Sequence, residues 1–388
     1  MKISIDATPV IHGTRAIRRH SKNLINALLL LDQANDYAVF YINWRNNKKI
    51  AHNFVNGGEL DECRIRIPGR ILVPLWRHFA FPRAEWMMGK TDILYATHLY
   101  FPPVKQGIVL GSVRGVAYGV IKDKLIPTEA AQLDTGLKFT LKHADYLLAV
   151  SSKTREELID RFGVSEDRIF VVPHGVDGGF CQLTDRGQLV SRLSEKFKIS
   201  SPYILYVGVI GHHKNIMGIL KAYSIIRERG LPLSLVLAGP SGSAWRDAHD
   251  WIAKEGLGQN IHLLGPIDQS TNDLRDLYNG ASLFVFPSFY EGWTAPPVEA
   301  MACGVPVVTS NVSSIPETVG DAAIQVDPNN LEELAYQMER VLTDTSLRTE
   351  LIEKGLTRAA SQTWEKTGLK LLRVFHEIQQ KGPWKRGK

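Results

Sequence analysis

Cysteine is scarce in this sequence, with three residues in 388 that lie far apart, Cys63, Cys181 and Cys303. An odd number of widely spaced cysteines indicates a reducing compartment and argues against disulfides or a cysteine-based metal site. No apolar stretch approaches the roughly 18–20 residues that a membrane-spanning helix needs. The N-terminal segment reads as a buried strand, because no hydrophobic signal region or cleavage site follows it. We therefore expect a cytoplasmic protein.

Low-complexity tracts and short repeats are also absent, and 44% apolar with 22% charged residues is ordinary for a globular protein. The length exceeds what one core usually supports, so we expect two domains. Residues 1–175 carry 24 Lys and Arg against 17 Asp and Glu, whereas residues 176–388 carry 22 against 23. The net charge of +6 therefore belongs to the first half.

This uneven charge indicates that the first half meets an anionic partner, either a lipid headgroup or a diphosphate-linked acceptor. A merely solvated basic surface is the alternative. Nucleic acid is disfavoured, because the sequence has no basic stripe interleaved with stacking aromatics and no known reader motif. Contact with the inner face of a membrane stays open at this point.

Strand patterns alternate with helical patterns, which is typical of parallel α/β sheets. Strands are expected at 2–7, 37–42, 93–96, 146–150, 168–172, 203–208, 233–238, 281–287 and 305–309. Helices are expected at 18–31, from 151, at 216–229, 273–280, 331–342 and 365–381. The pattern restarts near residue 203 after a polar, unpatterned stretch at 178–200 that reads as a linker. We predict an α/β protein of two Rossmann-like domains, residues 1–177 and 178–364.

The segment Phe289–Pro306, FYEGWTAPPVEAMACGVP, carries the most information about function. Glu291 and Glu299 lie eight residues apart, between a short strand and the start of an apolar helix. A helix entered in this way points free backbone N–H groups and a positive dipole at a ligand, which suits phosphate. Two acids beside such a site would bind hydroxyl groups on either side of the phosphate. A nucleotide sugar has hydroxyls at both ends.

The segment resembles the E-x7-E motif of the retaining, GT-B fold glycosyltransferases of family 4. The resemblance implies that Glu299 holds the ribose of the donor and that Glu291 contacts the transferred sugar. It also implies a GT-B fold, with the two domains facing across a cleft and the C-terminal helix, about 365–388, crossing back to the first domain. The backbone after the first glutamate should bind the donor too, at Gly292, Trp293, Thr294 and Ala295.

Two further loops of the second half fit the same resemblance. VGVIGHHKN at 207–215 is similar to the family's VG-x4-RKN loop, which makes Gly208, His213 and Lys214 donor-binding residues and Lys214 the diphosphate-binding cation. His213 stands where the family has arginine, and a solvated lysine is the alternative for Lys214. LLGPID at 263–268 corresponds to the loop whose backbone reads the nucleobase, through Leu264 and Gly265.

The first half departs from its relatives where the acceptor should bind. Arg18 replaces a glycine of the loop that many members have here, whereas Arg19 keeps the family pattern. Guanidinium groups at this place suit an acceptor phosphate or simply begin a basic helix. Arg114 and Gly115 replace a histidine and an aspartate that contact the transferred sugar. Arginine cannot shuttle a proton, yet it can stabilise a leaving diphosphate. His98 is the nearest alternative imidazole, as an acceptor-binding or a structural residue.

The resemblance implies retaining hexosyl transfer without a strong protein nucleophile, in which positioning and charge stabilisation supply the catalysis. Glu291, Lys214 and Arg114 are the expected catalytic residues. No metal is expected, because no DxD pair ends a strand near the site, and no cofactor is expected beyond a UDP- or GDP-linked donor sugar. The expected acceptor is a glycan or lipid-linked precursor of a bacterial surface polysaccharide.

Two alternatives remain open. The first is a donor-binding but catalytically silent partner of an active transferase. Its evidence is Arg114, Gly115 and the basic stretch around Arg18. The second is a sugar-nucleotide epimerase, which is disfavoured because those enzymes lack this E-x7-E motif. Residues 71–88 add a mixture of Trp76, Phe79, Phe81 and Trp86 with arginines, which suits either a membrane interface or the core.

Overall fold

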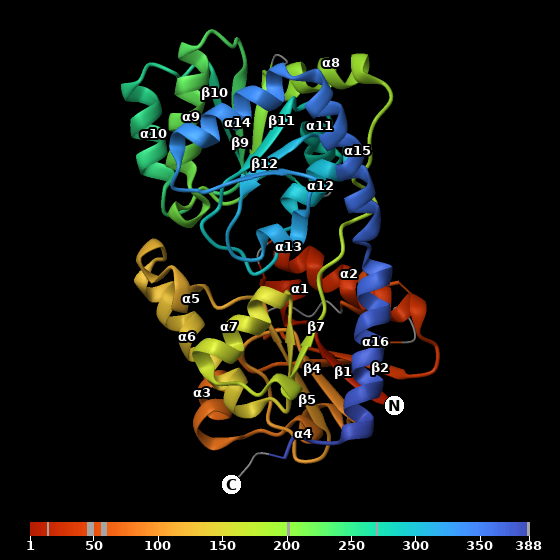
Figure 1. Cartoon of the computed structure of the whole chain (residues 1–388). Helices are drawn as coiled ribbons and strands as arrows, with labels where there is room; N and C mark the ends of the chain where they lie inside the picture. Colours follow the sequence, from red (N-terminus) through yellow and green to blue (C-terminus); the bar gives the residue numbers. More distant parts are fainter. Residues whose placement is uncertain (14, 45–49, 56–59, 200–201, 269–270, 386–388) are drawn as a thin grey trace. The chain divides into compact units, whose positions relative to one another are not determined.

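The computed structural model describes residues 1–13, 15–44, 50–55, 60–199, 202–268 and 271–385. The chain divides into two compact units (Figure 1). Unit 1 comprises Met1–Gly119, Thr128–Gly175 and Trp364–Lys388, and unit 2 comprises Val120–Pro127 and Val176–Thr363. The assignment of residues 120–127 to unit 2 is a feature that nothing in the sequence indicates.

Unit 1 contains a seven-stranded parallel sheet in the order β3-β2-β1-β4-β5-β6-β7. The strands are β1 (Lys2–Asp6), β2 (Asp36–Ile42), β3 (Asp61–Ile65), β4 (Ile93–Ala96), β5 (Ile108–Val113), β6 (Tyr146–Ala149) and β7 (Ile169–Val171). The helices are α1 (Thr8–His12), α2 (Arg15–Leu31), α3 (Gly69–Phe79), α4 (Ala84–Met88), α5 (Ala117–Val120), α6 (Pro127–His143), α7 (Ser152–Phe162) and α16 (Trp364–Lys381).

Both faces of the unit 1 sheet are buried. Successive side chains of a strand point to opposite faces, so each strand contributes to two cores. On β4, Ile93 and Tyr95 pack into one core and Leu94 into the other. The first core includes apolar residues of α16, among them Leu371 and Phe375. The last helix of the chain therefore completes the core of the first unit.

Unit 2 contains a six-stranded parallel sheet in the order β10-β9-β8-β11-β12-β13. The strands are β8 (Tyr203–Val207), β9 (Ser234–Ala238), β10 (Ile261–Gly265), β11 (Leu283–Phe286), β12 (Val307–Ser310) and β13 (Ile324–Val326). The helices are α8 (Arg186–Phe197), α9 (Ile216–Glu228), α10 (Trp245–Lys254), α11 (Asp273–Gly280), α12 (Pro296–Ala302), α13 (Ile315–Val319), α14 (Leu331–Thr343) and α15 (Thr345–Ser361). The predicted α/β class with two Rossmann-like domains is confirmed.

One prediction of local structure is wrong. The stretch 178–200 is not an unpatterned linker, because it contains the twelve-residue helix α8. Asp185 caps this helix by accepting the Gln188 N–H at 3.1 Å, and Leu189 and Leu193 are buried against the unit 2 core. The apolar face of α8 is narrow and lies among polar residues, so the sequence pattern did not reveal the helix. Packing of this face against the core, rather than intrinsic helix propensity, stabilises the helix.

The strand-turn-helix order predicted around Glu291 and Glu299 is confirmed by β11 and α12. The helix expected from residue 151 is α7, which Ser151 caps by accepting the Thr154 N–H on its Oγ at 3.1 Å. Within the described residues, none of the helices combines the length and the apolar character that crossing a bilayer requires.

Candidate active site

The candidate donor site lies at the carboxyl edge of the unit 2 sheet, where the loops follow one another in the spatial order of their strands. Backbone hydrogen bonds join neighbouring loops. Gly239 N–H donates to the Gly265 carbonyl at 2.8 Å, and Phe289 N–H donates to the His213 carbonyl at 2.9 Å. The predicted donor residues on this edge are Gly208, His213, Lys214, Leu264, Gly265 and Glu291.

Gly208 and Gly239 bring the loops after β8 and β9 into close approach. Their φ angles are 157° and 155°, a region that residues with a side chain rarely adopt. A Cβ atom on Gly239 would lie 1.8 Å from the Gly208 carbonyl oxygen. A Cβ on Gly208 would lie 2.5 Å from the hydroxyl of Tyr206. Glycine is therefore required at both positions.

Lys214 ends a short 3-10 turn, and Asn215, in a left-handed conformation with φ 57°, leads into α9. The Asn215 side-chain amide fixes this turn by donating to the Pro328 carbonyl at 2.7 Å. Lys214 Nζ forms an ion pair with Glu291 Oε1, and the two side chains are only 14% and 12% exposed. The two predicted catalytic residues of unit 2 are thus in direct contact.

The backbone of Glu291 is held by two serines that sequence analysis did not identify. Ser313 Oγ accepts the Glu291 N–H at 3.2 Å and donates to the Glu291 carbonyl at 2.5 Å. Ser314 Oγ donates to the same carbonyl at 2.8 Å. Ser313 has φ 59°, a strained conformation that the two hydrogen bonds help to hold. The signal in the sequence is a pair of adjacent serines that two residues separate from the buried strand β12.

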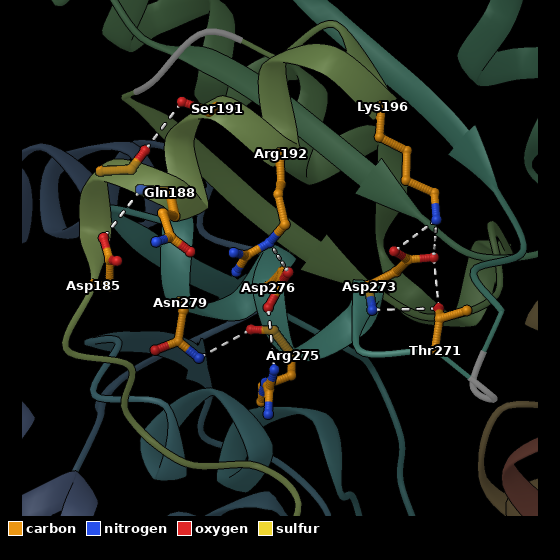
Figure 2. A network of polar contacts seen from close by, with 11 residues as sticks. Asp185, Gln188, Ser191, Arg192, Lys196, Thr271, Asp273, Arg275, Asp276 and Asn279 are labelled. Atoms are coloured by element: carbon orange, nitrogen blue, oxygen red, sulfur yellow. Dashed lines mark hydrogen bonds and ion pairs between the residues drawn. The ribbon is translucent and has the colours of Figure 1, made fainter.

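Glu299 lies in the first turn of α12 and is 2% exposed. Tyr278, a fully buried residue of α11, donates its hydroxyl to Glu299 Oε2 at 3.0 Å. Tyr278 is a second residue that the sequence did not reveal. A polar network joins α11 to α8, in which Arg192 Nε donates to Asp276 Oδ2 at 2.9 Å (Figure 2).

The turn before α12 holds the other predicted donor residues. Gly292 and Thr294 are buried, and Trp293 packs against the unit 2 core. Their contact with a donor stays a prediction, as it does for Ala295, the residue before α12.

His213 differs in charge from the arginine that the family resemblance leads one to expect. Burial, together with the nearby Lys214 and His212, lowers the pKa of His213 to about 3. The imidazole is therefore neutral at pH 7 and cannot act as a second cation for a diphosphate. Of these two residues, only Lys214 can supply the predicted positive charge for a diphosphate.

In unit 1, three polar side chains meet at the ends of the adjacent strands β1, β4 and β5. They are Asp6, His98 and Arg114, of which Asp6 was not identified from the sequence. Asp6 is 2% exposed, and its Oδ1 accepts the Thr8 N–H at 2.8 Å. Burial raises the pKa of Asp6, and the nearby charges of His98 and Arg114 oppose that rise. The predicted acceptor side thus contains a buried carboxylate as well as cations.

Arg114 is largely enclosed. Its Nη2 donates to Ser21 Oγ at 3.4 Å, and its Nε is buried without a hydrogen-bond partner among the described residues. Burial lowers the pKa of Arg114, which Tyr95 and Asp6 oppose. An arginine held in this way suits the predicted stabilisation of negative charge.

The other predicted residues of unit 1 lie on α2. Arg18 is exposed and donates its Nε to the Gly13 carbonyl at 2.8 Å, while Arg19 is partly buried. The ring of the neighbouring His20 lies tilted against His174, with centroids 3.8 Å apart, and its centroid is 5.1 Å from that of Trp364. Acceptor binding by Arg18 and Arg19 stays a prediction.

Two Rossmann-type units, each built on a parallel sheet, are the architecture of the GT-B glycosyltransferases, and the lysine and glutamates at the carboxyl edge of the second sheet lie where the resemblance predicts the donor site. Comparison with family models agrees. The model described as Glycosyl transferases group 1 matches residues 191–358, and the model described as Glycosyltransferase Family 4 matches residues 59–178. The chain therefore contains a family 4 glycosyltransferase domain in its first half and a group 1 glycosyltransferase domain in its second half.

Individual relatives extend the match over nearly the whole chain. The O-antigen chain mannosyltransferase B of Escherichia coli is 28% identical over 380 residues, which cover 94% of this chain and 97% of that protein. Sucrose-phosphate synthase from Thermosynechococcus elongatus has the same fold, with a TM-score of 0.75, 19% identity and coverage of 98% and 100%. Anabaena HepE, solved in complex with UDP and glucose, has a TM-score of 0.69, 15% identity and coverage of 97% and 99%.

Proposed function

We propose that the protein is a retaining, metal-independent hexosyltransferase that uses a UDP- or GDP-linked sugar to extend a glycan or lipid-linked acceptor of a bacterial surface polysaccharide. The observation that carries the proposal is the direct contact between Lys214 and Glu291 at the edge where Glu299 also lies. Similarity to an O-antigen mannosyltransferase supports the hexose and the class of acceptor.

The chemistry assigned to each residue follows from its surroundings. Lys214 would neutralise the charge that develops on the departing diphosphate. Glu291, with its backbone held by Ser313 and Ser314, would orient the hexose. Both carboxylates of the motif already have partners, Lys214 for Glu291 and Tyr278 for Glu299, which favours positioning over nucleophilic attack. The phosphate oxygen of the donor would then take the proton of the acceptor hydroxyl.

The test is a panel of UDP-, GDP- and ADP-sugars, GDP-mannose among them, scored by thermal shift and by turnover with and without a crude lipid-linked acceptor extract. Wild type is compared with Glu299→Ala and with Glu332→Ala, a matched change at a side chain 75% exposed on α14. Stabilisation by one donor that only Glu299→Ala abolishes, together with transfer, supports the proposal. Binding without any turnover favours the silent-partner alternative, and no binding by wild type refutes the donor site.

We also propose that unit 1 contacts the membrane through an aromatic-basic surface on α3, α4 and the loop between them. Its exposed aromatic residues are Phe79, Phe81 and Trp86, at 73%, 46% and 69% exposure. Five basic residues between 66 and 90 are exposed, Arg66, Arg70, Arg77, Arg83 and Lys90. Such a mixture is typical of interfacial binding to anionic lipids. Trp76, grouped with these aromatics in the sequence, is 2% exposed and belongs to the core instead.

Cosedimentation with vesicles tests this surface. Wild type should bind vesicles that contain phosphatidylglycerol, and Phe79→Ser with Trp86→Ser should weaken the binding at least tenfold. Tyr336→Ser, at an aromatic residue 55% exposed in unit 2, is the control and should bind like wild type. Equal binding by all variants would contradict the proposal.

A further inference from the structure

Tyr278 joins two parts of unit 2 that are distant in sequence. It is fully buried on α11, and its hydroxyl donates to Glu299 Oε2 on α12 at 3.0 Å. We propose that Tyr278 is a positioning residue that fixes the Glu299 carboxylate for the ribose hydroxyls of the donor. The inference rests on the proposed function, because it names the part of the donor that Glu299 holds.

A glutamate needs such a partner to discriminate between hydroxyl groups. Three side-chain torsions lie between its backbone and its carboxylate, and each rotamer points the oxygens in a different direction. A carboxylate accepts about four hydrogen bonds, so one from Tyr278 fixes the plane of the group and leaves acceptor capacity for a ligand. The directions of the remaining lone pairs are then set before the donor arrives.

The tyrosine ring is itself held in place. Phe180 contacts it edge-on with ring centroids 5.6 Å apart, and Phe284 of β11 lies at the same distance in a tilted arrangement. A rigid ring transmits the position of α11 to the hydroxyl. The location of the Glu299 carboxylate is therefore tied to the location of this helix.

Helix α11 is also anchored through residues other than Tyr278. The Asn279 side chain bonds both ways with the segment before α8, accepting the Leu183 N–H at 2.7 Å and donating to the Cys181 carbonyl at 3.0 Å. The ion pair of Arg192 with Asp276 adds a link to α8 (Figure 2). A continuous set of contacts thus leads from α8 through Tyr278 to Glu299.

Other buried tyrosines of unit 2 show what a purely structural hydroxyl looks like. Tyr203 donates to the Leu277 carbonyl at 2.6 Å, and Tyr223 donates to the Leu233 carbonyl at 2.7 Å. Both bonds satisfy backbone oxygens within the fold. Tyr278 instead donates to the charged side chain that is predicted to bind the ligand.

The experiment compares Tyr278→Phe with Tyr223→Phe, because each variant loses one buried hydroxyl from the same unit. Calorimetry measures the binding of UDP, GDP and ADP and of the 2′,3′-dideoxy form of each. For the nucleotide that wild type binds, Tyr278→Phe should raise Kd about tenfold, the usual effect of losing a hydrogen bond to a charged group. The dideoxy form should bind equally to wild type and Tyr278→Phe, since it has no hydroxyl for Glu299. In turnover assays KM should rise while kcat stays unchanged.

The outcomes separate the two proposals. A tenfold loss seen with the ribonucleotide alone, and absent in Tyr223→Phe, supports the positioning role. Equal Kd values for Tyr278→Phe and wild type would overturn it, and so would a loss that persists with the dideoxy nucleotide. If wild type binds none of the nucleotides, the proposed function itself is overturned.

Discussion

The contact between Lys214 and Glu291 should weaken the affinity of the protein for a nucleoside diphosphate. A diphosphate that binds Lys214 must compete with the Glu291 carboxylate, which is only 12% exposed and repels the incoming anion. Two unit charges about 4 Å apart interact by roughly 4 kcal/mol at an effective dielectric constant of about 20. Desolvation and the remaining hydrogen bond offset much of this, which leaves about 1–2 kcal/mol. Glu291→Gln preserves the shape and removes the charge.

The expected result is that Glu291→Gln binds UDP or GDP about tenfold more tightly than wild type, since about 1.4 kcal/mol corresponds to that factor. Sugar transfer should fall at least a hundredfold, because the hexose loses its orienting carboxylate. Calorimetry at fixed salt measures the first effect and a turnover assay the second. Glu332→Gln, on an exposed side chain, is the control. Unchanged or weaker binding of the diphosphate would refute the idea that Glu291 sequesters the lysine.

Three further predictions follow from other parts of the molecule. Burial lowers the pKa of both His20 and His174 well below 6.5. Below that pH the unfolded chain therefore binds more protons than the folded protein. The free energy of unfolding should fall by about 1 kcal/mol per histidine from pH 7.5 to 5.5. Urea titrations should show this slope flattened in His20→Asn. Gly239→Ala places a Cβ 1.8 Å from a carbonyl oxygen and should lower the free energy of unfolding by about 3 kcal/mol or more in the same assay. The control Gly258→Ala, whose Cβ meets open space, should lower it by less than about 1 kcal/mol. Arg114→Gln should leave the Kd for the nucleotide unchanged and lower turnover about tenfold or more, and a normal rate would remove Arg114 from the catalytic set.

The elements that carry the predicted donor residues were largely predictable because their signals are local. A β-branched run, a turn with prolines and an apolar helix define the segment from β11 to α12, and the resemblance to the family motif singles out Glu291 and Glu299 within it. The glycines of the loop after β8 are equally local. Each of these features is set by residues that are close together in the chain.

The supporting residues could not be predicted, because their roles depend on packing between distant segments. Ser313 reaches Glu291 only through the order of strands in the sheet and a left-handed backbone. Tyr278 reads as one more apolar residue of α11 until α12 is placed beside it. Asp6 ends a buried strand, a position that marks the carboxyl edge of a sheet, yet only the neighbouring strands bring His98 and Arg114 close to it.

The position of α16 has a consequence for how the protein is made. This helix packs on α2 so closely that a Cβ on Gly368 would lie 2.7 Å from Leu31, and its Leu371 and Phe375 are fully buried in the unit 1 core. During synthesis the strands of unit 1 leave the ribosome before unit 2, but α16, which completes the cover of one face of their sheet, is translated only after unit 2. Until then the part of that apolar face that α16 covers is open to water. The growing chain must keep this surface from aggregating while all of unit 2 is made.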